Sequence, residues 1–206
     1  MSTLSGLKSR VAEDLARTDL TSQIANAVAD AIYDYQERRF AFNQVREDFA
    51  TVDGTEFYTS AELPDGIIKI DSIRAEVNGR RYQLEEWGYS KMERVASLAT
   101  PTEGQPLAWA WYGEELRLYP VPDAAYTLTM SYHYRLDPPA DDASNAWTDE
   151  VKAGQLIRLS AARRIAREYL KDDAEASRFE VGEVLQLKRL QRAGRLLETG
   201  GLVGSM

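Results

Sequence analysis

His133 is the single imidazole with which this chain of 206 residues could do acid–base chemistry. It lies in the middle of a predicted strand, on the polar face, and the sequence around it supplies no carboxylate and nucleophile that would complete a catalytic triad. We therefore interpret His133 as a surface residue of that strand. The chain has no cysteine and no second histidine, so the sequence predicts neither a metal site nor a cofactor.

Pairs of adjacent carboxylates are the other residues that could act as acid and base. A glycoside hydrolase needs two carboxyl groups that face each other, about 5 to 9.5 Å apart. Neighbouring residues of a strand point to opposite faces, and acidic side chains on loops are ordinarily solvated. We therefore interpret the pairs as surface charge and predict that the protein is not an enzyme. The pairs are Glu85-Glu86, Glu114-Glu115, Asp141-Asp142 and Asp172-Asp173.

Trp109 and Trp111 alternate with small residues on one predicted strand and could stack on sugars or bases. Aromatic side chains of this size are more often part of a core. Two alternative functions stay open on these residues. One is a small cell-wall glycan hydrolase that uses two of the carboxylates, and the other is a carbohydrate-binding module that uses the two tryptophans.

The charge balance limits the kinds of partner. Lys and Arg number 25 against 33 Asp and Glu, a formal net charge of −8. This balance argues against a protein that binds nucleic acid by neutralising phosphates, but not against one that surrounds DNA without holding it. No apolar run approaches the roughly 20 residues that span a bilayer, so no membrane partner is predicted. The first 17 residues carry charges where a signal peptide needs an apolar segment.

Apolar residues at helical spacing predict helices at both ends of the chain, within 4–39 and 149–198. The last predicted helix, from residue 172, carries acidic residues early and basic residues late, which suits the helix dipole. Its predicted apolar stripe consists of Phe179, Val184, Leu187, Leu190 and Leu197.

Residues 40–136 carry the period-two patterns and turn signals of antiparallel strands. Asn78-Gly79 predicts a hairpin, because a type I′ turn needs positive φ at both positions. The stretch 105–136 predicts a three-stranded antiparallel meander with an aromatic-rich inner face. The predicted fold class is therefore α+β, a helical bundle from the N- and C-terminal helices with an inserted antiparallel β region.

The order of these features resembles the head-to-tail adaptor (connector) proteins of tailed bacteriophages, of the podovirus type. The resemblance covers residues 20–197. The segments that carry it are Phe57-Tyr58, Glu62-Leu63-Pro64, IKIDSIRAEVNGRRYQLE, GQPLAWAWYGEELRLYPVPDAAYTLTMSYHYR and the paired helices that follow them.

The resemblance implies a structural protein of the virion neck that is assembled in the host cytoplasm. Such adaptors form a ring, typically a dodecamer, that docks beneath the portal protein and receives a tail protein of the nozzle or tube. DNA passes through the lumen of the ring during ejection without specific binding, and the acidic charge of this chain suits such a channel. We expect one adaptor domain over 1–198, with helices in 4–39 and 149–198 and the β-rich insertion at 40–136, followed by a flexible C-terminal tail at 199–206.

Two groups of residues are candidates for the contacts within such an assembly. Charged residues near the end of the second predicted helix are expected to mediate self-association, namely Asp34, Glu37, Arg38 and Arg39. The resembling adaptors grip the portal with their C-terminal segment. The corresponding residues here are Arg189, Arg192, Arg195, Leu196, Leu197, Leu202, Val203 and Met206.

Overall fold

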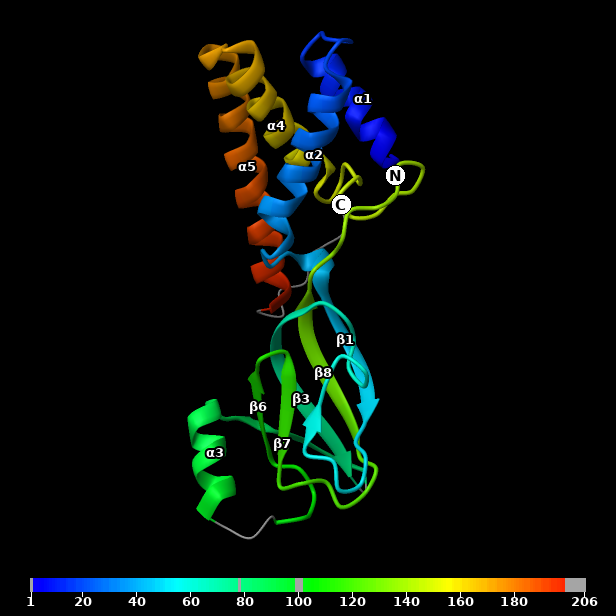
Figure 1. Cartoon of the computed structure of the whole chain (residues 1–206), viewed down its shortest axis with the longest axis vertical. Helices are drawn as coiled ribbons and strands as arrows, with labels where there is room; N and C mark the ends of the chain where they lie inside the picture. Colours follow the sequence, from blue (N-terminus) through cyan, green and yellow to red (C-terminus); the bar gives the residue numbers. More distant parts are fainter. Residues whose placement is uncertain (1, 78, 99–101, 199–206) are drawn as a thin grey trace. The chain divides into compact units, whose positions relative to one another are not determined.

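The computed structural model describes residues 2–77, 79–98 and 102–198, and it divides the chain into two compact units. The helical unit combines Met1–Asn43 with Leu136–Met206, and the β unit is Gln44–Arg135. Helices therefore come from both ends of the chain, and the β structure is inserted between them (Figure 1). The predicted α+β class is confirmed, with the β region placed as expected.

The helical unit is a bundle around one apolar core. Helix α4 lies between its partners and packs against α1, α2 and α5. The helices alternate in direction, so that the α1–α2 turn and the α4–α5 turn lie at one end of the bundle (Figure 1). The elements are α1 (Leu4–Asp14), α2 (Thr21–Gln36), the 3-10 helix η1 (Ala41–Asn43), α4 (Gly154–Ile165), the π-helical segment η2 (Ala166–Leu170) and α5 (Asp173–Glu198).

The acidic segment 137–153 is anchored to this bundle, although its prolines and carboxylates predict a projecting loop. Trp147 is buried, and its ring meets Phe40 and Phe42 edge-on at 6.1 and 5.3 Å. Its indole N–H donates to the carbonyl of Leu136 over 2.6 Å. The turns that this anchor imposes delay the start of α4 to Gly154, five residues after the predicted start.

The first turn of α1 is capped by Thr3, whose Oγ1 accepts a hydrogen bond from the N–H of Gly6 over 3.1 Å. Thr3→Ala is expected to lower the free energy of unfolding by about 1 kcal/mol, because the N–H of Gly6 then loses its acceptor. Urea denaturation would measure this loss. Thr18→Ala, at an exposed threonine between helices, is the control and should change the stability little. An unchanged midpoint for Thr3→Ala would contradict the assigned cap.

The β unit contains two four-stranded sheets. The first has the strand order β1-β8-β3-β4 and the second β2-β7-β6-β5. All pairs are antiparallel except β5 with β6. The strands are β1 (Gln44–Ala50), β2 (Phe57–Tyr58), β3 (Ile67–Val77), β4 (Arg80–Gln83), β5 (Glu85–Glu86), β6 (Ala108–Tyr112), β7 (Glu115–Tyr119) and β8 (Thr127–Tyr134).

Both faces of β6 are covered, and this explains its alternation of small and large residues. Trp109 belongs to the apolar core that contains residues of both sheets, with Leu118, Ile73 and Met130 among its other members. On the opposite face, the small Ala108 and Ala110 form a second cluster with Met92 of α3 (Tyr89–Leu98). An aromatic inner face and a small-residue outer face therefore let one strand support a sheet on one side and a helix on the other.

The predicted meander over 105–136 is wrong in its third strand. Strands β6 and β7 do form a hairpin, with positive φ at Gly113 and Glu114. Strand β8 instead joins the other sheet, because β1 and β3 offer it long partners on both sides, and the two-residue β2 pairs with β7. Periodicity predicts that a segment is a strand and which face is buried, but it does not identify the neighbouring strand.

Candidate functional site

The carboxylate pairs lie on separate elements, and one member of each of three pairs has a structural partner. Glu85 pairs with Lys91 at 3.3 Å, Asp141 pairs with Lys8 at 2.6 Å, and Asp172 accepts a hydrogen bond from the backbone of α5. Within the part of the chain that the structure describes, no group of three or more His, Asp or Glu residues could hold a metal ion.

The predicted surface position of His133 is wrong, since its exposed fraction is only 6%. Strand β8 is an interior strand flanked by β1 and β3, so even a side chain on the polar face is covered by its neighbours. Trp109, a proposed sugar platform, is 2% exposed and belongs to the core between the sheets. A buried ring cannot stack on a carbohydrate, so the candidate site has to be sought among the surfaces that could contact other proteins.

The charged residues at the end of α2 differ in whether they already contact other residues of their own bundle. Asp34 already pairs with Arg164 of α4, which also approaches Asp30 at 4.0 Å. Glu37 is exposed, and the guanidinium of Arg38 lies over the Tyr35 ring at 5.2 Å. Arg39 is half-buried. Asp34 is exposed and is paired within its own bundle, and Glu37 and Arg38 are also exposed.

The predicted portal-binding residues fall on α5 and beyond it. Arg189 and Arg192 are exposed on the helix. Arg195, Leu196 and Leu197 lie within the bounds of α5, but their side chains are outside the description. Leu202, Val203 and Met206 lie outside the described residues.

Helix α5 presents an apolar surface that the sequence analysis missed. Val181, Val184 and Leu185, here called the α5 ridge, are 62%, 43% and 61% exposed. The predicted place of Val184 in the buried stripe is wrong, because the face of α5 toward the bundle is made by Phe179, Glu183, Leu187 and Leu190. The i, i+4 pair Val181 and Leu185, lying opposite that stripe, was the available signal. An exposed apolar helix surface next to polar residues is typical of a protein–protein contact.

A buried ionic network joins α2, α4 and α5 beneath this surface. The carboxylate of Glu183 accepts a hydrogen bond from the hydroxyl of Tyr35 and one from Nε of Arg163, both over 2.5 Å. Burial alone would raise the pKa of Glu183, but hydrogen bonds from Arg163 and Tyr35 and the Arg163 charge outweigh it, so that its pKa lies below the usual value. Burial and the same carboxylate raise the pKa of Tyr35. Glu183 lies inside the apolar stripe of α5, and this misplaced charge was the signal for the network.

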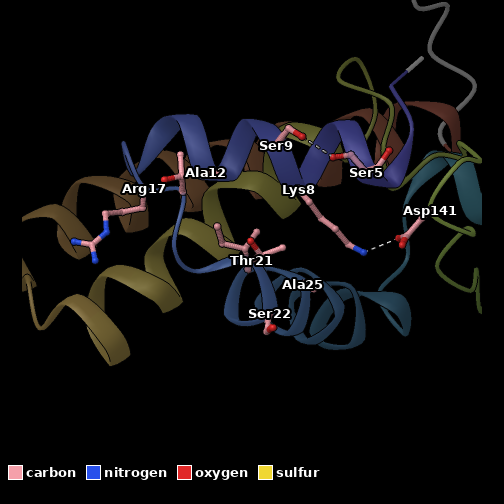
Figure 2. Close-up of a pocket in the computed structure, with 11 residues that line it drawn as sticks. Ser5, Lys8, Ser9, Ala12, Arg17, Thr21, Ser22, Ala25 and Asp141 are labelled. Carbon is pink, nitrogen blue, oxygen red and sulfur yellow. Dashed lines mark hydrogen bonds and ion pairs between the residues drawn. The ribbon is translucent and has the colours of Figure 1, made fainter.

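A groove of about 490 Å³ runs between α1 and α2 on another side of the bundle (Figure 2). Small side chains line its middle, and the ion pair of Lys8 with Asp141 lies at one end and Arg17 near the other. Hydrogen bonding and ion pairing to Asp19 raise the pKa of Arg17. The small lining residues are Ser5, Ser9, Ala12, Thr18, Thr21, Ser22 and Ala25, and the buried Ile24 also lines the groove.

In the β unit, Arg117 holds α3 against its sheet. Its side chain is 8% exposed, pairs with Glu56 at 2.6 Å and with Glu93 of α3, and lies 5.0 Å from the centre of the Phe57 ring. Arg117→Met is expected to lower the stability by about 1 to 3 kcal/mol, because two partly exposed carboxylates lose their shared donor. Thermal denaturation would measure the loss. Arg94→Met, at an exposed arginine of the same helix, is the control. Equal effects of the two substitutions would contradict the role given to Arg117.

The sequence of the chain was compared with those of known protein families. Residues 2–199 match the family model described as SU10 adaptor protein. No curated protein matches the chain. Among the helices that the structure describes, none is long and apolar enough to cross a membrane.

Proposed function

The chain belongs to the SU10 adaptor family of phage head-to-tail adaptor proteins, and from this premise we propose that it forms a ring beneath the portal of a tailed phage and connects the capsid to the tail. The observation that carries the proposal is the match over residues 2–199, which includes the helical unit and the β unit alike. The ring is a dodecamer in the virion neck, and its role is structural rather than catalytic.

The charge of the chain supports a role in guiding DNA. With a net charge of −8, a ring of many copies presents an acidic lumen that repels phosphates, so that DNA slides through it without specific binding. The tail end of the ring receives a nozzle or tube protein.

The surface residues of α2 and α5 are the proposed contact points. Glu37 and Arg38 on α2 contribute to contacts between copies, and exposed charge pairs of this kind are worth only about 0.2–1 kcal/mol each. Arg189 and Arg192 on α5 lead into the segment that grips the portal, together with Arg195, Leu196, Leu197, Leu202, Val203 and Met206.

Inactivating the gene in the phage that carries it tests this proposal. We expect DNA-filled heads without tails, visible by electron microscopy, and tails that attach again when the full-length chain is supplied in trans. An Asp65→Asn chain, changed at an exposed turn residue of the β unit, is the control and should restore attachment as the wild type does. Normal tailed particles made without the protein would contradict the proposal.

A further inference from the structure

We propose that the α5 ridge of one copy packs into the α1–α2 groove of the next copy and so forms the repeating contact of the ring. The inference rests on the proposed function, because it names the contact through which that ring is built. Its occupant is a second copy of this chain, identified by shape, by position and by charge.

The α5 ridge has the shape of a helix surface that fits a groove. Val181 and Leu185 are one turn apart and Val184 lies beside them, so the three side chains form a short continuous row. None of them belongs to the apolar core of their own bundle, although Phe179 of the same helix does. A row of this kind buries its apolar surface when it enters the groove between two helices.

The α1–α2 groove is lined mainly by small side chains. Apart from the buried Ile24, the side chains between its two charged ends are no larger than threonine, so the backbone of an approaching helix can come close to α1 and α2 (Figure 2). Ala12 and Ala25 are half-buried and supply apolar contacts in this middle part. Ser5, Ser9 and Thr21 are exposed, and the hydroxyl of Ser9 donates to the carbonyl of Ser5.

The ridge and the groove lie on opposite sides of the bundle, as a head-to-tail contact requires. In Figure 2 the groove opens between α1 and α2, and the ribbons of α4 and α5 lie behind it. Helix α4 separates α1 from α5 and packs against both. One copy can therefore offer its ridge on one side while its groove receives the ridge of another copy. Contacts between two different surfaces of identical chains close into rings when the rotation is suitable.

The α5 ridge and the α1–α2 groove also lie at similar positions along the axis of the bundle. Helix α5 descends from the end that carries the α1–α2 turn, and near its far end Gly194 lies beside Ala41 of η1. Its basic residues Lys188, Arg189 and Arg192 follow the ridge toward that far end. The first residues of α1 lie toward the same end, where their N–H groups donate to the carbonyls of Asp141 and Ala143.

The charges beside the two surfaces support a contact in which neighbouring copies lie at the same level. The segment that binds the start of α1 carries the exposed carboxylates Asp137, Asp141 and Asp142. A neighbouring copy at the same level, with its ridge in the middle of the groove, brings Lys188, Arg189 and Arg192 to this acidic segment. The apolar row faces the small-residue middle and the cations face the carboxylates, and the reverse register would lose both matches.

Cysteine cross-linking in assembled particles tests the contact, and the chain suits it because it contains no native cysteine. A chain with both Ala12→Cys and Leu185→Cys should form a ladder of disulfide-linked multimers on non-reducing gels after oxidation of the particles. The two single variants, incorporated together, should give a linked dimer and nothing larger, because each linked pair then has no further cysteine. The matched control is Ala12→Cys with Tyr33→Cys, since Tyr33 is as exposed as Leu185 but lies outside the ridge, and it should form no ladder.

The outcomes separate this inference from the proposed function. Particles that contain the double variant but show no ladder, or show as much linkage with Tyr33→Cys, overturn the contact and leave the adaptor role intact. Absence of the wild-type chain from the particles overturns both. Leu185→Asp gives a second readout: the purified chain should keep the wild-type melting temperature but lose incorporation into particles, whereas Tyr33→Asp keeps both. Full incorporation of Leu185→Asp would also overturn the contact.

Discussion

Glu183→Ala should lower the free energy of unfolding by about 3 to 5 kcal/mol, because it leaves the guanidinium of Arg163 in the bundle without its carboxylate partner. The same substitution removes the acceptor of the Tyr35 hydroxyl, which is held at 2.5 Å. Urea denaturation at pH 7 would measure the loss. Glu180→Ala is the matched control, because Glu180 lies one turn away on α5 and pairs with Arg167 at the surface. Its effect should stay below about 1 kcal/mol.

The pH dependence of this loss has a fixed direction. The pKa of Glu183 is lower in the folded chain than its usual value, so the stability it contributes is present above the unfolded pKa of about 4.3 and is lost as the pH falls through the folded pKa. The difference between the wild type and Glu183→Ala should therefore shrink in acid. Replacing both partners, in Glu183→Leu with Arg163→Met, should cost less than Glu183→Ala alone. A difference that grows in acid would contradict the network described for Glu183.

Removal of residues 196–206 should leave a folded protein that no longer attaches to DNA-filled heads. Ordering a chain segment costs about 1–2 kcal/mol of backbone entropy per residue, and burying Leu202, Val203 or Met206 in a partner returns about 1.5–3 kcal/mol each. The balance is near even for one copy, so docking needs the adjoining helix and many copies acting together. Losing the segment from every copy at once therefore abolishes attachment. Sedimentation of heads with bound adaptor would measure it.

A chain of the original length with Leu202→Ser, Val203→Ser and Met206→Ser tests whether attachment needs the apolar side chains or only the presence of the segment. This variant should fail to attach as the truncated chain does, while Ser205→Ala should attach normally. The melting temperature of all three chains should match that of the wild type. Undiminished attachment of the truncated chain would show that other residues hold the portal.

The helices and most strands could be predicted because their signals are local. The spacing of Leu4, Leu7 and Val11 depends only on which face of α1 is buried, and all three are in the core. The Asn78-Gly79 signal likewise lies between the paired strands β3 and β4. Trp109 faces the core for the same reason, since alternation along β6 fixes the face.

The features that the sequence did not predict depend on contacts between distant residues. The position of β8 between β1 and β3 follows from pairing partners more than 50 residues away, and this pairing also buries His133. The exposure of Val184 depends on how α5 packs against α4, which helical spacing alone does not define. The groove between α1 and α2 requires the separation of two helices, and the partner of Asp34 is on another element, α4.

The β unit begins and ends on neighbouring strands, with Gln44 opposite His133 in the register of β1 and β8. The hydrogen bonds between β1 and β8 therefore hold its two chain ends side by side. A segment whose ends are adjacent, such as residues 44–135, can be replaced as one unit. Recombination between phages can replace such a segment as a whole while the helical bundle keeps both of its halves. A chimaera joined at residues 43 and 136 would therefore exchange the whole β unit and leave both halves of the helical bundle in place.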